Sequence, residues 1–348
     1  MCGTHPSEQP PTRQRTLQRH DDILPNDTAL GRVFNELASR RVTRLPGLDA
    51  DELHTLRELG VRVGGHRACL EPDIELLSAA SLRDALAPPT EAWLRDLEVR
   101  AHIDSTNTSL LARAEHGRIA GCVLAAEVQT AGRGRRGRSW LSPFGRNLAV
   151  SIGVAIARPV AEIGALSLVV GVAVRRALLE HGLSGVALKW PNDILLDGRK
   201  LAGILIELVR AVAPVEVVIG IGVNVGCAAR VAERIDQSVA DVAEQIDGPT
   251  RNALLARILD HVVAACGAFD AAGFERFRDE WNDAHFHCGA PVLVTPADVG
   301  SLEAGRKTAA SVAGKVLDVG ADGALRIETA DGVRSFTGGE VTMRTATD

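Results

Sequence analysis

Residues 189–207 read KWPNDILLDGRKLAGILIE, which combines a polar turn, two apolar segments and two lysines. Because proline fixes φ and has no N–H, the turn at Pro191 is rigid and presents Asn192 and Asp193. The apolar segments on both sides of the Asp-Gly pair predict a β-hairpin. Lys189 and Lys200 flank this unit, and two fixed cations suit a phosphate or a carboxylate. The alternative is that both lysines are solvated at the ends of the hairpin.

The composition limits the class of partner. A chain of 348 residues is long enough for two or three domains with sizeable cores. The net charge is −5, so no overall basic field attracts nucleic acid. Aromatic residues make up 3% and tyrosine is absent, which argues against stacking platforms for single-stranded nucleic acid.

Cysteine use and hydropathy indicate the compartment. The six cysteines are scattered without a C-x-x-C pair, which fits a reducing cytoplasm better than a disulfide framework or a zinc site. The N-terminus has no apolar signal segment, and the longest apolar run, residues 163–174, is too short to span a bilayer. We expect a soluble, cytoplasmic protein without a membrane segment.

The N-terminal region predicts a small winged-helix-like module. Residues 1–27 are polar and without periodicity, as in a disordered tail. A helix follows from Thr28, and a second begins at Asp49 with Glu52 as its capping-box partner and Gly60 as its end. A two-strand ribbon with a turn at Gly64-Gly65 completes the module, residues 28–71.

Two features of this module weigh against DNA binding. Only about nine residues separate its helices, which leaves little room for the third helix of a helix-turn-helix. The second helix also carries four acidic residues against one arginine, the wrong sign for a phosphate backbone. The next segment, residues 72–98, is punctuated by prolines and predicts a linker with short helices.

Polar side chains follow the first strand of the main domain. The strand runs over residues 99–103 and leads into Asp104-Ser105-Thr106-Asn107 and a helix over residues 108–116. Hydroxyl and amide groups at a strand-to-helix corner are available to bind a ligand. An ordinary helix N-cap is the alternative.

A second strand, residues 122–127, leads to Gln129 and the segment 132–140, GRGRRGRSW. Its glycines allow close approach to a ligand, and its arginines offer planar donors for phosphate or carboxylate. We expect this loop to be mobile when empty and ordered when an anion binds. A surface patch for RNA is the alternative, but it would be isolated in an acidic protein.

The remaining pattern predicts a layered α+β domain and an all-β end. Buried strands are predicted over residues 148–157 and 215–225, and helices over residues 160–183 and 251–281. The second strand contains Gly220-Ile221-Gly222-Val223-Asn224, and glycine inside a strand often marks the close approach of a ligand. From Cys288, short strands with Asp-Gly turns predict a small β-barrel.

Taken together, segments 104–107, 132–140, 189–207 and 220–224 closely resemble the bacterial biotin–protein ligases, which include the form that is also the biotin operon repressor. The resemblance implies an α+β fold in which a mixed sheet like that of class II synthetases forms a catalytic domain over residues 99–287. It also implies an SH3-like domain over residues 288–348, whose closing strand matches Gly338-Gly339-Glu340-Val341. The N-terminal module resembles the repressor's winged helix in shortened form.

The resemblance also implies roles for individual residues. The implied biotin-binding residues are Ser105, Thr106, Asn107, Gln129, Gly132, Arg133, Gly134, Arg135, Lys200 and Gly203. The implied ATP-binding residues are Arg138, Trp140, Lys189, Asn192 and Asn224. Arg135, Lys189 and Lys200 would be catalytic. Metal ligands are unassigned, and Asp193 is left open between ligand support and a magnesium shell.

The implied reaction uses ATP and Mg²⁺ to convert biotin to biotinoyl-5′-AMP and then transfers biotin to a lysine of a biotin carboxyl carrier protein. A homodimer through an edge of the central sheet is also compatible with the resemblance. One rival is a lipoate–protein ligase, although lipoate has no ureido group for Ser105, Thr106 and Gln129 to bind. The other is a bifunctional ligase and biotin-dependent repressor, against which the acidic second helix argues.

Overall fold

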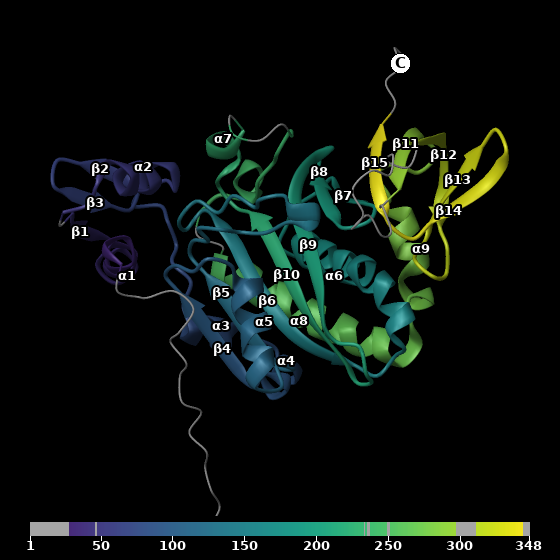
Figure 1. The fold of residues 1–348 in the computed structure, drawn as a ribbon, viewed down its shortest axis with the longest axis horizontal. Helices are drawn as coiled ribbons and strands as arrows, with labels where there is room; N and C mark the ends of the chain where they lie inside the picture. The colour runs from purple at the N-terminus through teal and green to yellow at the C-terminus, as the bar shows by residue number, and fades with distance from the viewer. Residues whose placement is uncertain are drawn as a thin grey trace, which may run out of the picture.

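The computed structural model describes residues 28–45, 47–232, 234, 237–248, 251–296 and 311–343. The predicted tail, residues 1–27, lies outside the described residues. Three sheets of three, seven and five strands follow one another along the chain. Figure 1 shows the N-terminal module and the C-terminal sheet at opposite ends of the molecule, with the seven-stranded sheet between them.

The N-terminal module contains two helices and three short strands. These are α1 Ala29–Arg40, β1 Val42–Arg44, α2 Ala50–Glu58, β2 Arg62–Gly64 and β3 Arg67–Cys69. Thr28 caps α1, and the predicted capping box between Asp49 and Glu52 is confirmed at the start of α2. Strand β1, which we did not predict, joins the predicted ribbon in a sheet of order β1-β3-β2. Within its described residues the module therefore has a strand, not a helix, between α1 and α2.

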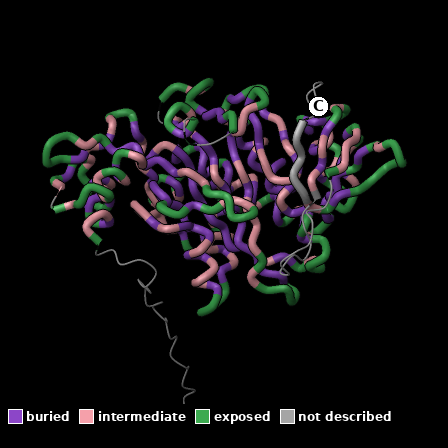
Figure 2. The backbone as a smooth tube through the Cα atoms, turned by 45° about the horizontal axis from the view of Figure 1, so that its top comes forward, coloured by how far each residue is buried: buried purple, intermediate pink, exposed green. Residues whose placement is uncertain are grey.

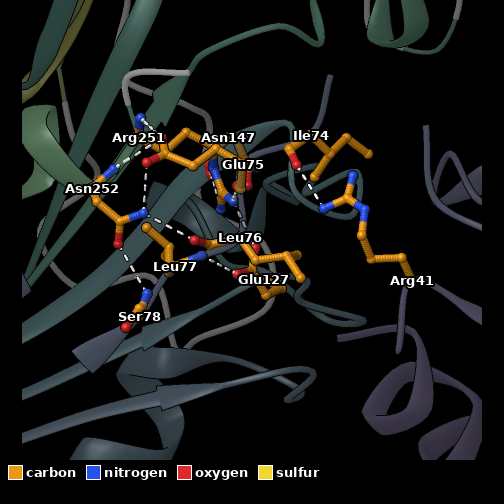
Figure 3. A network of polar contacts seen from close by, with 10 residues as sticks. All are labelled: Arg41, Ile74, Glu75, Leu76, Leu77, Ser78, Glu127, Asn147, Arg251 and Asn252. Atoms are coloured by element: carbon orange, nitrogen blue, oxygen red, sulfur yellow. Dashed lines mark hydrogen bonds and ion pairs between the residues drawn. The ribbon is translucent and has the colours of Figure 1, made fainter. Parts of the chain in front are cut away.

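This module packs directly on the central domain. Its apolar core includes Phe144, whose ring stacks on Phe34 with centroids 5.6 Å apart. The Phe144 N–H also donates to the Leu59 carbonyl at 2.8 Å. Arg41, at the end of α1, donates to the carbonyl oxygen of Ile74 at 3.0 Å (Figure 3). It also donates to the carbonyl oxygen of Glu71 at 2.7 Å.

The segment predicted as a linker with short helices has those helices, but it packs against the central domain. It forms α3 Ala79–Ala85 and α4 Pro88–Trp93, and both helices contact α8. A buried ion pair helps to anchor this segment: Arg251 Nη1 lies 2.7 Å from Glu127 Oε2 (Figure 3). The side chains of Arg251 and Glu127 are 3% and 2% exposed. Glu127 Oε1 accepts from the Leu77 N–H at 2.5 Å. Composition missed this because prolines mark turns but do not reveal which apolar residues become buried.

Seven strands form the central mixed sheet. They are β4 Asp96–Arg100, β5 Cys122–Ala126, β6 Asn147–Ile156, β7 Val186–Lys189, β8 Asp193–Leu196, β9 Arg199–Arg210 and β10 Val215–Asn224. The order is β4-β5-β6-β10-β9-β8-β7, and only β4 and β5 run parallel. The predicted hairpin is confirmed between β8 and β9, where Asp197 and Gly198 both have positive φ.

Helices cover both faces of this sheet. The elements are α5 Thr106–His116, a 3-10 turn Arg135–Gly137, a 3-10 turn Val160–Ala165, α6 Leu166–Glu180, α7 Ala228–Val231, a 3-10 turn Val242–Glu244, α8 Arg251–Ala272 and α9 Glu275–Asp283. One face packs its alternating apolar residues under α6 and α8. The other packs against α5, where Leu110 and Ala114 cluster with Val218 of β10. Figure 2 shows the buried backbone running through the centre of the molecule.

Helix α8 is, among the described helices, the one long and apolar enough to cross a membrane by length and composition. Within the fold, however, it packs against α6 and β6, and 56% of its most apolar window is buried. Its apolar character is therefore that of a core helix.

Five antiparallel strands form the C-terminal sheet. They are β11 Pro291–Pro296, β12 Val312–Val319, β13 Leu325–Thr329, β14 Gly332–Phe336 and β15 Gly339–Met343, in the order β14-β13-β12-β11-β15. The predicted Asp-Gly turn at Gly323 has positive φ and contacts the central domain, where Trp190 Nε1 donates to the Gly323 carbonyl at 3.2 Å. The sheet agrees with the predicted all-β unit. Its closure into an SH3-like barrel stays a prediction.

Candidate active site

A cavity of about 680 Å³ opens on the α5 face of the central sheet. Its walls come from the start of α5, the loop 132–140, the β8–β9 hairpin and strand β10. Most of the residues predicted to bind a ligand line it, namely Ser105, Thr106, Asn107, Gln129, Arg133, Gly134, Arg135, Arg138, Trp140, Asn192, Lys200, Gly203 and Asn224. The fold therefore brings together segments that are far apart in the sequence.

One end of the cavity has a buried, hydrogen-bonded polar floor. Gln129 Oε1 accepts from the backbone N–H of Thr106 at 2.9 Å and from its hydroxyl at 3.1 Å. Ser151, which sequence reasoning missed, lies with its hydroxyl 2.8 Å from Thr106 Oγ1 and 2.5 Å from Asn107 Oδ1. Ser105 caps α5 and is 2% exposed. Such fixed hydroxyls and amides suit a compact polar group on a ligand.

Two glycines of β10 make room for this architecture. A Cβ on Gly220 would lie 2.3 Å from Asn107 Oδ1, and a Cβ on Gly222 would lie 2.4 Å from Trp140 Cε2. The two glycines therefore mark a close approach of other side chains, because they allow Asn107 and the Trp140 indole to lie against the sheet.

The arginine-rich loop folds over the cavity as a tight hairpin. Its base pairs the Trp140 N–H with the Gly132 carbonyl at 2.8 Å, and its tip has positive φ at Arg136 and Gly137. Arg133 Nη2 lies 2.8 Å from Glu207 Oε1, and Arg135 Nη1 donates to Asn192 Oδ1 at 2.9 Å. The loop is thereby joined to both β9 and the Pro191 turn. Its mobility in the absence of an anion stays a prediction.

The opposite end of the cavity is cationic. Lys200 Nζ lies 2.9 Å from Asp193 Oδ1 and 5.8 Å from the centre of the Trp140 ring. Asn224 holds this end in place, because its Nδ2 donates to the carbonyl oxygens of Lys200 at 3.3 Å and Ala240 at 3.1 Å. Asp193 therefore contacts Lys200, so its carboxylate orients the lysine.

Two predicted site residues lie elsewhere. Lys189, on the edge strand β7, is not among the residues that line the cavity. Lys189 lies opposite Asp193 in the β7–β8 pairing. Burial, together with the nearby positive charge of Lys189, lowers the pKa of His287 to about 4. Gly132 lines a second cavity of about 310 Å³ on the other side of the loop, towards α2. There a Cβ on Gly132 would lie 2.4 Å from the Trp140 carbonyl oxygen.

The segment after β10 contributes residues that sequence reasoning missed. Arg234, Gln237 and Val239 line the larger cavity, beyond the embedded glycines. Arg234 Nη1 lies 2.9 Å from Glu58 Oε2, so an ion pair reaches from this segment to the N-terminal module. No pattern in this segment resembled a motif, and only its proximity to β10 pointed to it.

The cysteine beside the cavity is unsuited to covalent catalysis. Cys227, whose Sγ lies 3.5 Å from Asn224 Oδ1, has its pKa raised to about 12 mainly by burial. Its thiol is thus protonated near neutral pH and unsuited to nucleophilic attack. Among the described residues, no group of three or more His, Cys, Asp or Glu side chains could hold a metal ion.

A cavity with a polar floor, a cationic end and an arginine-rich cover in an α+β domain suits an anionic small molecule. The family model for the Biotin/lipoate A/B protein ligase family matches residues 99–224. The bifunctional ligase/repressor BirA of Salmonella typhimurium is 34% identical over 299 residues, which cover 84% of this chain and 88% of the relative. The chain therefore belongs to the biotin/lipoate A/B protein ligase family.

Two further relatives are similar over the catalytic region. The biotin–[acetyl-CoA-carboxylase] ligase of Mycobacterium tuberculosis is 42% identical over 193 residues, covering 54% of this chain and 70% of that protein. The biotin protein ligase of Aquifex aeolicus, solved in complex with biotin and ATP, has a TM-score of 0.60 and 26% identity, and it covers 73% of this chain and 100% of that one. The predicted family resemblance and α+β fold are confirmed.

Proposed function

We propose that this protein is a biotin–protein ligase that uses ATP to activate biotin to biotinoyl-5′-AMP and transfers biotin to a lysine of a biotin carboxyl carrier domain. One observation carries the proposal: a single cavity joins a buried amide and hydroxyl floor to a lysine and an indole under an arginine-rich loop. The floor suits the ureido group of biotin, the lysine its carboxylate and the indole a nucleotide.

The floor recognises biotin through groups already in place. Ser105, Thr106, Asn107 and Gln129 offer buried donors and acceptors. Thr106 is held by its hydrogen bonds to Gln129, and Asn107 by its hydrogen bonds to Glu207 and Ser151. A buried ureido group left without partners would lose about 1–3 kcal/mol per unsatisfied group. Gly134 and Gly203 line the cavity and keep the backbone close to the ligand, and Arg133 belongs to the cover. The dithiolane ring of lipoate offers no such partners, so this floor favours biotin.

The first half-reaction brings two anions together. An oxygen of the biotin carboxylate attacks the α-phosphorus of ATP, a P–O bond forms, and the bond to pyrophosphate breaks. Lys200 holds the carboxylate and Arg135 meets the charge that develops on the phosphate, while Arg138, Trp140, Asn192 and Asn224 line the nucleotide side. Fixed cations offset the repulsion between the reactants and stabilise the transition state without reorganisation.

Lys189 retains a smaller role in this account. Because it does not line the cavity, we expect its charge to act on the phosphate tail at a distance. Mg²⁺ would supply charge neutralisation on the phosphates. Asp193, whose carboxylate contacts Lys200 at 2.9 Å, would be available to help hold such an ion.

In the second half-reaction the amine of a carrier lysine attacks the carbonyl carbon of the mixed anhydride. A C–N bond forms, the C–O bond to AMP breaks, and the amine loses a proton. The chain's contribution is to retain the anhydride and to exclude water, which is the work of the loop 132–140. No step requires a nucleophile from this protein. We expect the enzyme to act in the cytoplasm, where its carrier proteins are made.

The test is transfer to a carrier. The protein is incubated with biotin, ATP, Mg²⁺ and a recombinant biotin carboxyl carrier domain, and intact mass spectrometry follows the carrier. One biotinyl group per carrier is expected, and a carrier with its target lysine changed to arginine should stay unmodified. An unmodified carrier in the complete mixture would contradict the proposed function.

A repressor function rests on one observation, that the BirA relative named a ligase/repressor aligns with 84% of this chain. Against it, the module lacks a helix between α1 and α2 in its described residues, and α2 carries Asp51 and Glu52 in its first turn. We therefore expect no operator binding. A gel shift on the organism's own biotin-gene promoter, with biotin and ATP in low salt, checks this; a specific complex would establish the second function.

A further inference from the structure

Glu207 has no role in the reaction described above, yet it joins the two parts of the site that must work together. It lies on β9, with its side chain 20% exposed, and is not a cavity-lining residue. One carboxylate oxygen, Oε1, lies 2.8 Å from Arg133 Nη2 of the loop. The other, Oε2, accepts from Asn107 Nδ2 of the floor at 2.8 Å.

Each of these contacts continues into the site. Asn107 is oriented by Glu207 on its nitrogen side, so its Oδ1 faces the hydroxyl of Ser151, which in turn meets Thr106. Thr106 hydrogen-bonds to Gln129 and completes the floor. Arg133 follows Gly132 at the base of the loop hairpin and also lies 3.4 Å from the Thr108 hydroxyl on α5. A single carboxylate therefore connects the cover of the cavity to its floor.

The charge of Glu207 matters for the loop more than for the floor. The amide of Asn107 would still find an acceptor in the neutral carbonyl oxygen that a glutamine at this position would offer. The guanidinium of Arg133 gains its stronger interaction from an ionised acceptor. Because Glu207 contacts both Arg133 and Asn107, it links closure of the loop to the orientation of Asn107.

We propose that Glu207 is a positioning residue that holds the arginine-rich loop closed on the occupied pocket, through Arg133, and so retains the biotinoyl adenylate until the carrier arrives. This inference rests on the proposed function. It assigns to Glu207 control over how long the intermediate stays, and it leaves the chemistry of adenylation to the residues that touch the substrates.

The experiment compares Glu207→Gln, Arg133→Ala, the double variant and the wild type. Adenylate is formed on the enzyme from biotin and radiolabelled ATP, and its release after dilution is followed by filter binding. We expect each single variant to release adenylate about fivefold faster, which is about 1 kcal/mol, since the pair is partly exposed. The double variant should show about the same fivefold increase, because both changes remove one interaction.

Loop closure and folding are measured on the same proteins. In Glu207→Gln, biotin with ATP should protect the loop from trypsin less than in the wild type. The control is Glu280→Gln, which breaks a similarly exposed ion pair away from the cavity, where Arg176 Nε donates to Glu280 Oε1 at 2.9 Å. The thermal unfolding midpoint of Glu207→Gln should match that of this control. Glu280→Gln itself should release adenylate at the wild-type rate.

Three results would overturn the inference: unchanged release in Glu207→Gln, additive effects in the double variant, or faster release in Glu280→Gln as well. A larger loss of thermal stability in Glu207→Gln than in the control, with release unchanged, would make Glu207 a structural residue. Failure of the wild type to form any adenylate would instead refute the proposed function, so the two failures are distinguishable.

Discussion

Gly220 and Gly222 lie two residues apart on the same face of β10, and adding one methyl group to each should impair different substrates. In Gly222→Ala the new Cβ would lie 2.4 Å from Trp140 Cε2, whereas carbon atoms pack at about 3.5–4.0 Å. The indole must therefore move by about 1 Å away from the sheet. Because Trp140 is half-buried beside the cavity, it can move, and the cost should appear as weaker ATP binding.

In Gly220→Ala the Cβ would lie 2.3 Å from Asn107 Oδ1. Asn107 is 4% exposed and bonded to both Ser151 and Glu207, so its displacement would disturb the floor. Overpacking of this kind costs about 1–3 kcal/mol, equivalent to about 5- to 150-fold in a binding constant. We expect this loss in the affinity for biotin in Gly220→Ala and in the affinity for ATP in Gly222→Ala.

The assay is pyrophosphate exchange at varied biotin and varied ATP, with thermal unfolding as a check on folding. Gly226→Ala serves as the control, because a Cβ there meets its nearest neighbour, Arg146 Nη1, at 3.6 Å and should change neither Michaelis constant. Equal effects of the two site variants on both substrates, or the reverse assignment, would refute the division of the cavity into a biotin floor and a nucleotide side.

Three further variants test other parts of the account. Lys200→Ala should lower the rate of adenylation by about tenfold or more, because a charged contact to the substrate is lost. The double variant Lys200→Ala/Asp193→Asn shows whether part of the loss comes from leaving the Asp193 carboxylate unpaired. A lower thermal midpoint with unchanged kcat/KM would make the lysine structural. Arg135→Gly should loosen the loop and let adenylate escape, labelling bystander proteins on a blot; unchanged carrier selectivity would count against the loop's role. Burial lowers the pKa of His285 to about 3 in the folded protein. Between about pH 6.5 and pH 3 the unfolded chain therefore binds a proton that the folded chain does not, so the free energy of unfolding decreases as the pH is lowered. His285→Leu should flatten this loss in midpoints measured at pH 7 and pH 5; an equal slope in both proteins would contradict it.

The features that sequence predicted best are local. The hairpin at Asp197 and Gly198 follows from two residues that tolerate positive φ, and the capping box of α2 follows from a three-residue spacing. Family motifs added the cavity residues, since four short segments at compatible spacing specify one site. The helical prediction for residues 251–281 was also direct, but the structure divides this stretch into α8 and α9 at Gly273, which has positive φ.

The features that sequence missed depend on contacts between distant segments. Strand β1 has three residues and exists because it pairs with β3, and α3 and α4 fold because α8 offers an apolar surface. Lys189 was expected at the cavity, but the sheet order puts its strand at the edge, beyond β8. Ser151 and Glu207 are single polar residues in strands, and nothing in their local pattern reveals that Asn107 lies between them.

The central claim is that this cavity activates biotin. Biotin-dependent exchange of labelled pyrophosphate into ATP tests it most directly, with lipoate run in parallel on the same enzyme. The account predicts exchange with biotin and none with lipoate, because the amide and hydroxyl floor requires a ureido partner. Exchange with lipoate, or with neither acid, would contradict the assignment of the pocket.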